Sequence, residues 1–377
     1  MIRRLQVIVV VLAAALALTT TVSIGSATTA GLRPGTVTGV AQLGAWGGLS
    51  GTHRISYLTT DAYGAIVPAA GIVRIPTGPR PAGGWRIVSW AHGTSGLGPS
   101  CGLTGSPDLI RGTAPTIDDL NRAGYAVVAT DYIGLSPGSP DPHPYLQSRS
   151  EASAVIDIVR AARSMFVGLS RSWVVGGSSQ GGHAALAAAH LAPTYAPELD
   201  FHGTAALAPA SNFEQLIPLI RPGATRLPKV TAGSFAAVLA GMSVGQHDVD
   251  VSDYLSPLGK RIVEEIGRSC GPEWEGILDG ARPDDLLSKP LGDDTFRAAI
   301  RKYMGVRAAG HTEPILVIQG LRDTTVPMPL TMALLSEFRS AGTTFDLKLF
   351  NAGHSDLRAH GADRTLRDFY TKILAPR

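Results

Sequence analysis

The feature that most constrains the fold is a short apolar stretch that runs into Gly177-Ser178-Ser179-Gln180-Gly181 and is followed at once by the alanine-rich segment 184–191. The spacing Gly-x-Ser-x-Gly between a strand and a helix is typical of a nucleophile elbow, a sharp turn that holds a serine hydroxyl at the edge of a sheet. A Cβ at either flanking glycine would crowd the neighbouring backbone. Because the chain holds 44 glycines, an ordinary glycine-rich turn is the alternative interpretation.

Strands and helices are expected to alternate on both sides of this turn. The expected strands are 53–59 and 66–75 (a hairpin), 85–90, 125–130, 202–207, 313–319 and 345–350, and the expected helices are 116–123, 148–165, 330–338 and 366–374. Thr116-x-x-Asp119 and Ser148-x-x-Glu151 are typical of capping boxes at two of the helix starts. Residues 31–50 are expected to form an extended lead-in. The pattern predicts an α/β fold, a mostly parallel sheet with helices on both faces.

One region interrupts the alternation. Residues 209–311 contain no clear strand, and the apolar run 235–242 favours a helix. We therefore expect a core of 31–209 and 313–377 and a helical lid or cap at 210–312. In a parallel α/β fold this insertion lies at the carboxyl ends of the strands, where ligands bind. It either shapes an apolar pocket or is extra core.

The amino terminus is typical of a targeting segment. Arg3 and Arg4 precede the apolar run Val7–Leu18, and small and polar residues follow. The run is shorter than the roughly 20 residues of a membrane span. We interpret residues 1–30 as a secretory signal peptide and expect a secreted protein.

Charge and composition exclude some partners. The net charge is +3, and no basic cluster is interleaved with aromatic residues, so nucleic acid is not expected as a partner. No Cys, His or Asp grouping has metal-ligand spacing, so neither a metal nor a cofactor is expected. Cys101 and Cys270 form an even pair in an exported chain, and they are either one disulfide or two buried thiols.

A serine nucleophile needs a base, and the base needs an acid to orient it. Asp323 follows the buried stretch 314–318, and His354 follows the last expected strand. The order Ser179, Asp323, His354 is that of α/β-hydrolases. Asp323 could instead cap the next helix at the surface, and Asp356 is a rival acid, although it lies too near His354 along the chain to orient it.

A tetrahedral intermediate also needs fixed donors for its oxyanion. The expected donors are the backbone N–H of Gln180 and Thr94, in the loop His92-Gly93-Thr94, with the Thr94 hydroxyl as an additional donor. A tight loop without a catalytic role is the alternative for this stretch. His183 and His190 are expected to be packing or surface residues.

With these residues in view, the chain resembles the secretory lipase family, which includes fungal lipase A-type enzymes. The resemblance is carried by residues 57–61, 92–94, 124–132 and 143–145, together with the elbow, Asp323 and His354. It implies an α/β-hydrolase with a helical lid that acts on carboxylic esters, including triacylglycerols.

The resemblance also bears on particular residues. It implies that Thr94 is the oxyanion residue, where some fungal members have aspartate, and that Cys101 pairs with Cys270. Because 23 residues follow His354, the long C-terminal flap of some fungal members is expected to be missing. The expected partner is a small-molecule or lipid ester, with transient contact with a lipid interface as a further possibility.

Three functions use these residues differently. The first is an exported serine esterase or lipase that forms an acyl-enzyme on Ser179. The second is an acyltransferase or serine peptidase with the same triad, and the third is a non-catalytic binding protein that keeps the fold.

Overall fold

The computed structural model describes residues 32–108, 112–224 and 231–375, of which those from Arg33 onward belong to one compact unit. The signal peptide expected at 1–30 lies outside the described residues. No helix within the described residues combines the length and the apolar character that crossing a membrane requires.

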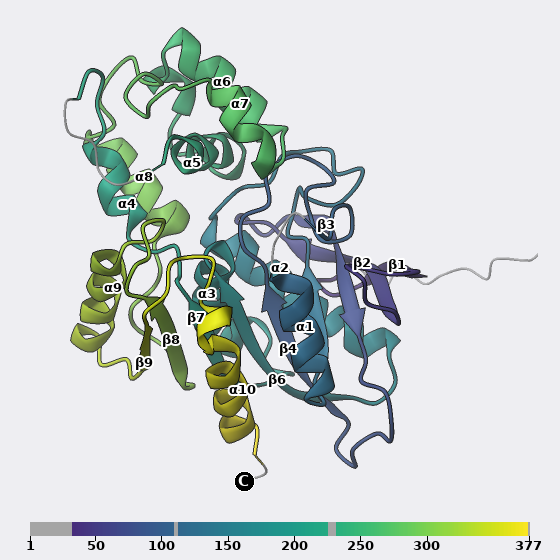
Figure 1. The fold of residues 1–377 in the computed structure, drawn as a ribbon. Helices are drawn as coiled ribbons and strands as arrows, with labels where there is room; N and C mark the ends of the chain where they lie inside the picture. The colour runs from purple at the N-terminus through teal and green to yellow at the C-terminus, as the bar shows by residue number, and fades with distance from the viewer. Residues whose placement is uncertain (1–31, 109–111, 225–230, 376–377) are drawn as a thin grey trace, which may run out of the picture. The chain divides into compact units, whose positions relative to one another are not determined.

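In the described residues nine strands form one sheet (Figure 1). They are β1 (Val37–Gln42), β2 (Thr52–Thr60), β3 (Ile66–Arg74), β4 (Trp85–Ala91), β5 (Ala126–Thr130), β6 (Leu169–Ser178), β7 (Asp200–Leu207), β8 (Ile315–Gly320) and β9 (Asp346–Phe350). The spatial order is β1-β2-β3-β5-β4-β6-β7-β8-β9. The pairs from β1 to β5 are antiparallel, and those from β5 to β9 are parallel. The predicted mostly parallel sheet is therefore confirmed.

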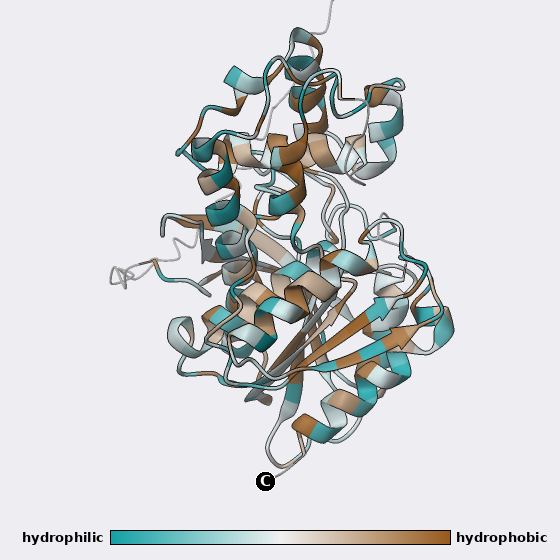
Figure 2. Ribbon diagram, turned by 90° about the vertical axis from the view of Figure 1, so that its left-hand side faces the viewer, coloured by the Kyte–Doolittle hydropathy of each residue, from teal (hydrophilic) through white to brown (hydrophobic). Residues whose placement is uncertain are grey.

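Helices cover both faces of the sheet, because successive side chains of a strand point to opposite faces. On β6, Trp173 and Val175 pack with α2 (Ser148–Met165) and α3 (Gln180–Tyr195), while Val174 packs with α1 (Thr113–Arg122) and α10 (Ala362–Ile373). The helix α9 (Met328–Ser340) packs with β8 and α3. Figure 2 shows hydrophobic residues along the central strands.

Three local expectations were wrong. The stretch 31–50 is not only a lead-in, because β1 pairs with β2. The helix α1 begins at Thr113, so Thr116 lies inside it and does not cap it. The cap of α2 is Gln147, whose side chain accepts from the Ser150 N–H. Glu151 accepts the Leu146 N–H instead, because its carboxylate points into the protein and not back to Ser148.

Where the structure describes it, the segment between β7 and β8 consists of helices joined by loops and contributes no strand to the sheet (Figure 1). Its helices are α4 (Phe213–Leu216), η1 (Ile217–Leu219), α5 (Ala232–Gly245), η2 (Val251–Tyr254), α6 (Pro257–Gly267), η3 (Gly271–Glu273), α7 (Trp274–Leu278) and α8 (Asp294–Met304). They share an apolar cluster with Tyr145 and Leu146 of the core. We call this segment the insertion. Its division from the core at 210–312, and its action as a lid, stay predictions.

A disulfide between Cys101 and Cys270 joins the core to the insertion. Backbone hydrogen bonds flank the bridge: Leu97 N–H donates to the Ser269 carbonyl at 3.0 Å, and Gly271 N–H donates to the Ser95 carbonyl at 2.8 Å. The bridge closes a sequence separation of 169 residues. In the chain-entropy model such a loop stabilises the folded state by about 5 kcal/mol.

The elbow depends on close backbone packing at Gly177 and Gly181. A Cβ on Gly181 would lie 1.9 Å from the Ala91 carbonyl oxygen, and one on Gly177 would lie 2.5 Å from the same oxygen. Because this oxygen belongs to the backbone of β4, it cannot rotate away as a side chain would. The glycines therefore let α3 and β4 approach each other.

We expect Gly181→Ala to lower the free energy of unfolding by about 2–3 kcal/mol, since the added methyl group overpacks a backbone contact. Urea denaturation measures the change. The control is Gly276→Ala in α7, where an added Cβ meets no atom within 4 Å. A Gly181→Ala protein as stable as the Gly276→Ala protein would contradict the packing argument.

Glu214 of α4 is a buried carboxyl group, and its Oε2 has no hydrogen-bond partner. Burial raises the pKa of Glu214 to about 7, the charge of His183 lowers it, and that of Glu337 raises it further. The folded protein therefore holds a proton that the unfolded chain releases above the ordinary pKa of 4.5. Through this group, folding stability falls as the pH rises from about 4.5 to about 7.

Glu214→Gln is neutral at every pH, so it should remove this loss. Relative to wild type, the variant should gain on the order of 3 kcal/mol in free energy of unfolding between pH 4.5 and pH 8. Urea denaturation at both pH values measures the difference, with Glu264→Gln, on an exposed side chain, as the control. A difference that does not change with pH would contradict the prediction.

Candidate active site

Ser179 lies at the turn between β6 and α3, in a backbone conformation that non-glycine residues rarely adopt. Its φ is 59° and its ψ is −118°. Its N–H donates to the Leu207 carbonyl on β7 at 2.8 Å, and its own carbonyl accepts the N–H of Ala210 at 3.1 Å. The surrounding hydrogen bonds therefore hold a strained backbone, as expected for a nucleophile elbow.

The structure brings Ser179, His354 and Asp323 into one hydrogen-bonded chain. His354 Nδ1 lies 2.8 Å from Asp323 Oδ2, and His354 Nε2 lies 2.9 Å from Ser179 Oγ. An ionised carboxylate only accepts hydrogen bonds, so Nδ1 carries the proton and Nε2 accepts from the serine hydroxyl. This is the arrangement in which an imidazole acts as base toward a serine.

Asp323 is held by its own turn. Its Oδ1 accepts the backbone N–H groups of Thr325 and Val326 at 2.9 and 2.8 Å, and its Oδ2 accepts from Gln319 Nε2 at 3.2 Å. It does not cap α9, whose first turn follows Pro327. The rival Asp356 has its carboxylate 4.0 Å from Arg322 and 3.8 Å from His360. Asp323 is therefore the carboxylate that orients His354.

The two expected oxyanion donors, Gln180 and Thr94, both lie next to the elbow. Gln180 is the first residue of α3, where backbone N–H groups have no acceptor within the helix. The loop with Thr94 lies against the elbow: a Cβ on Gly93 would lie 3.3 Å from the Ser178 carbonyl oxygen and 3.8 Å from Ser179 Cβ. Thr94 and Ser179 line the same cavity. The role of both donors stays a prediction.

A buried ion pair beneath the elbow was missed by the sequence interpretation. Glu151 Oε2 lies 2.8 Å from His183 Nδ1, and the other ring nitrogen of His183 lies 2.9 Å from the Met304 carbonyl. Both neighbours of the ring are acceptors, which favours an imidazolium. Burial lowers the pKa of His183, but Glu151 and Met304 outweigh it, so that the pKa is raised.

The same carboxylate also binds the side chain of Gln180, one of the two expected oxyanion donors. Glu151 Oε1 accepts from Gln180 Nε2 at 2.8 Å and from Leu146 N–H at 3.0 Å. Gln180 Nε2 also donates to His143 Nε2 at 2.7 Å. Burial raises the pKa of Glu151, but the nearby His143 ring, 3.7 Å from Oε1, and the hydrogen bond and charge of His183 outweigh it and set the pKa at about 2. The spacing of Gln180 and His183, one turn apart on α3, was the signal that could have found this cluster.

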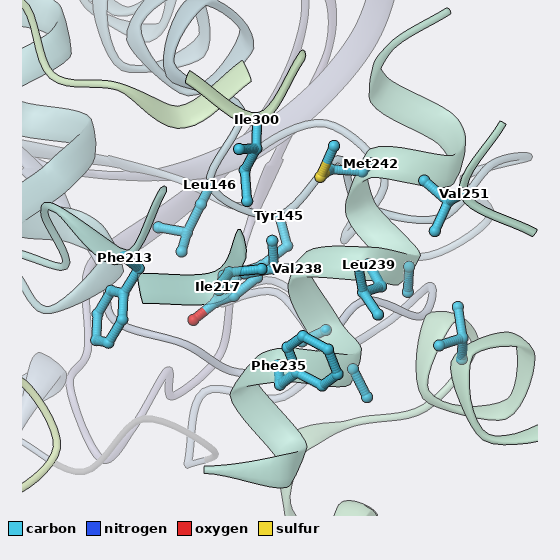
Figure 3. Packing of buried hydrophobic residues seen from close by; sticks show 14 of the residues in the cluster. Tyr145, Leu146, Phe213, Ile217, Phe235, Val238, Leu239, Met242, Val251 and Ile300 are labelled. Carbon is cyan, nitrogen blue, oxygen red and sulfur yellow. The ribbon is translucent and has the colours of Figure 1, made fainter. Parts of the chain in front are cut away.

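Ser179 and His354 open on a cavity of about 590 Å³. Much of its wall is apolar and comes from the insertion and nearby loops: Leu146, Ala210, Phe213, Ile217, Val238, Trp274 and Val326. Figure 3 shows part of this apolar cluster, including Val238 on α5 and Ile217 on η1. Other lining residues, Thr113, Thr116 and Arg358, are polar. Val238 belongs to the apolar run 235–242, and Ser234, which also lines the cavity, lies on the same helix α5.

Known proteins that are similar to this chain include two that are named as lipases. A protein named probable inactive lipase from Mycobacterium tuberculosis is 27% identical over 259 residues, covering 65% of this chain and 54% of its own length. Lipase A of Arthroderma benhamiae is 24% identical over 326 residues, covering 80% of this chain and 66% of its own length. The chain therefore spans less than two thirds of either relative.

The structure of Candida antarctica lipase A superposes with a TM-score of 0.74 at 19% identity, covering 92% of this chain and 84% of that one. This likeness establishes the fold as that of an α/β-hydrolase. The model of the family described as secretory lipase matches residues 113–270, which include the elbow and most of the insertion. The resemblance of this chain to the secretory lipase family is thereby confirmed.

Proposed function

We propose that this chain is an exported serine esterase or lipase that hydrolyses carboxylic esters through an acyl-enzyme on Ser179. The observation that carries the proposal is the chain of hydrogen bonds from Asp323 through His354 to Ser179, which opens on a largely apolar cavity. One relative is named an inactive lipase. The bonded triad of this chain favours activity.

In the proposed reaction Ser179 Oγ attacks the ester carbonyl carbon while His354 Nε2 takes the hydroxyl proton. The carbonyl π electrons move to the oxygen, which accepts hydrogen bonds from the N–H groups of Gln180 and Thr94. The intermediate collapses, and the alcohol leaves with the proton from His354. Water then cleaves the acyl-enzyme by the same steps. Asp323 holds the histidine tautomer and stabilises the imidazolium.

The lining of the cavity supports an ester with an apolar acyl chain and a more polar alcohol. Burying a methylene group stabilises a complex by about 0.8 kcal/mol, so the apolar wall formed with the insertion suits an acyl chain. The polar side chains of Thr113, Thr116 and Arg358 suit an alcohol such as glycerol. Export is supported by the basic and apolar amino terminus and by the disulfide, since disulfides persist in oxidising compartments.

We expect Ser179→Ala to lower kcat for p-nitrophenyl butyrate by on the order of 10⁵-fold, because the triad acts as a unit. A fluorophosphonate probe should label wild type and leave the variant unlabelled. Ser172→Ala is the matched control, because Ser172 lies on β6, the strand before the elbow, and its hydroxyl donates to Asp200. Equal hydrolysis by wild type and Ser179→Ala would disprove the mechanism. Transfer of the acyl group to an added alcohol or amine in preference to water would identify an acyltransferase.

We expect Val238→Phe to shorten the acyl chain that the enzyme accepts, because this buried side chain lines the cavity. Excluding four methylenes would lower kcat/KM for long esters by about 200-fold, while acetate and butyrate esters keep most of their rate. A series of p-nitrophenyl esters from acetate to palmitate measures the profile. Val244→Phe, on the same helix but 40% exposed, is the control. An equal loss at every chain length would contradict this role of α5.

A further inference from the structure

The motif His143-Pro144-Tyr145 has no role in the mechanism above, yet it lies at the cavity. Tyr145 is 4% exposed, lines the cavity with Thr94, and places its phenol oxygen 2.8 Å from Thr94 Oγ1. Thr94 is the residue expected to donate to the oxyanion. A hydroxyl beside it therefore decides where the proton of the threonine hydroxyl points.

The direction of this hydrogen bond follows from the two hydroxyls. A phenol is more acidic than an alcohol, so it is the better donor and the alcohol is the better acceptor. Burial raises the pKa of Tyr145 to about 12 against the opposing hydrogen bond of Thr94, so the phenol keeps its proton at any working pH. When Tyr145 donates, Thr94 Oγ1 uses a lone pair for the bond and its own O–H remains free to donate.

Three hydrogen bonds hold the backbone of Tyr145 and of the residue that follows it. Its N–H donates to the His143 carbonyl at 2.8 Å, and its carbonyl accepts from the Tyr303 hydroxyl of α8 at 2.9 Å. The next residue, Leu146, has a backbone φ of 61°, which residues other than glycine rarely adopt. Its N–H donates to the Glu151 carboxylate. A strained backbone held from several sides is a common property of functional sites.

One carboxylate holds both sides of the expected oxyanion hole. Glu151 Oε1 binds Gln180 on one side and the N–H that follows Tyr145 on the other. The insertion reaches the same place, since a Cβ on Gly241 of α5 would lie 2.6 Å from the Tyr145 nitrogen. The phenol is therefore located relative to the elbow, to the core and to the insertion at once.

We propose that Tyr145 is a positioning residue of the oxyanion hole: its phenol donates to Thr94 Oγ1 and directs the Thr94 hydroxyl proton toward the oxyanion. The inference rests on the proposed esterase function. It adds a third donor, the Thr94 O–H, to the two backbone N–H groups, and it makes that donor depend on a residue that does not touch the substrate's reacting atoms.

The test is a double-mutant cycle of Tyr145→Phe, Thr94→Val and the double variant, with kcat and KM for p-nitrophenyl butyrate. Loss of one oxyanion donor lowers kcat by roughly 10²-fold, so Thr94→Val should show about this loss and Tyr145→Phe about a 10-fold loss, with KM within twofold. Thr94→Ser should keep most of the wild-type rate. Because Tyr145 acts through Thr94, Tyr145→Phe should cost little in the Thr94→Val background.

A second readout uses an aryl boronic acid, which forms a tetrahedral adduct with an active serine. Its affinity should fall in parallel with kcat in both single variants. Tyr57→Phe removes a buried phenol that contacts the Thr130 hydroxyl at 2.6 Å on another part of the core, and it is the matched control for lost buried hydroxyls. The melting temperature of each variant separates lost folding from lost rate.

The outcomes distinguish the two proposals. Hydrolysis by wild type and none by Ser179→Ala support the proposed function whatever Tyr145 does. Unchanged kcat in Tyr145→Phe, or equal losses in both Thr94 backgrounds, would then overturn the positioning role alone. If Tyr145→Phe does not fold, a Thr94→Val protein with full kcat overturns it equally, since no hydroxyl would be left to position. A wild-type protein that neither hydrolyses esters nor reacts with fluorophosphonate overturns both.

Discussion

The buried carboxylate of Glu151 is the group on which the arrangement of the site depends. Taking an ionised carboxylate out of water costs several kcal/mol, which only well-placed partners offset. Here Leu146, Gln180 and His183 supply three donors, and the charge of His183 neutralises it. These donors come from a loop and from the helix of the nucleophile. The requirement to satisfy one charge therefore fixes the loop and the helix relative to each other.

The elbow is also held in place by its surroundings, through close packing and a backbone hydrogen bond and not through charge. Ser179 keeps a costly backbone conformation because β7 binds its N–H and because Gly181 allows the Ala91 carbonyl to come close. Neither contact involves the serine side chain, so its hydroxyl stays free for His354. The same packing therefore keeps the Ser179 backbone strained and leaves its side chain free.

The sequence was sufficient to predict the parts whose signal is local. The apolar stretches before Ser179, Asp323 and His354 predict strands, and strands that are parallel bring their ends to one edge, so the triad followed from chain order. Contacts that depend on the direction in which a side chain points could not be predicted from the sequence. Glu151 matched a capping box at α2, but its carboxylate turns inward because Gln180 and His183 lie there. The strand β1 was missed because it is short, contains Gly39 and has no buried residue, so it lacks the alternating apolar face that predicts a strand.

The disulfide also determines how the insertion can move. Cys270 is tied to Cys101, and the adjoining backbone pairs with Ser95 and Leu97, only a few residues beyond Thr94. This corner of the insertion is a fixed pivot, so it cannot separate from the core as a rigid flap. We expect any widening of the cavity to be smallest beside the bridge and largest at the helices furthest from it. The wall beside Thr94 then keeps its shape while the apolar wall changes, so that, for the proposed esterase, access for an acyl chain would vary without disturbing the expected oxyanion donors.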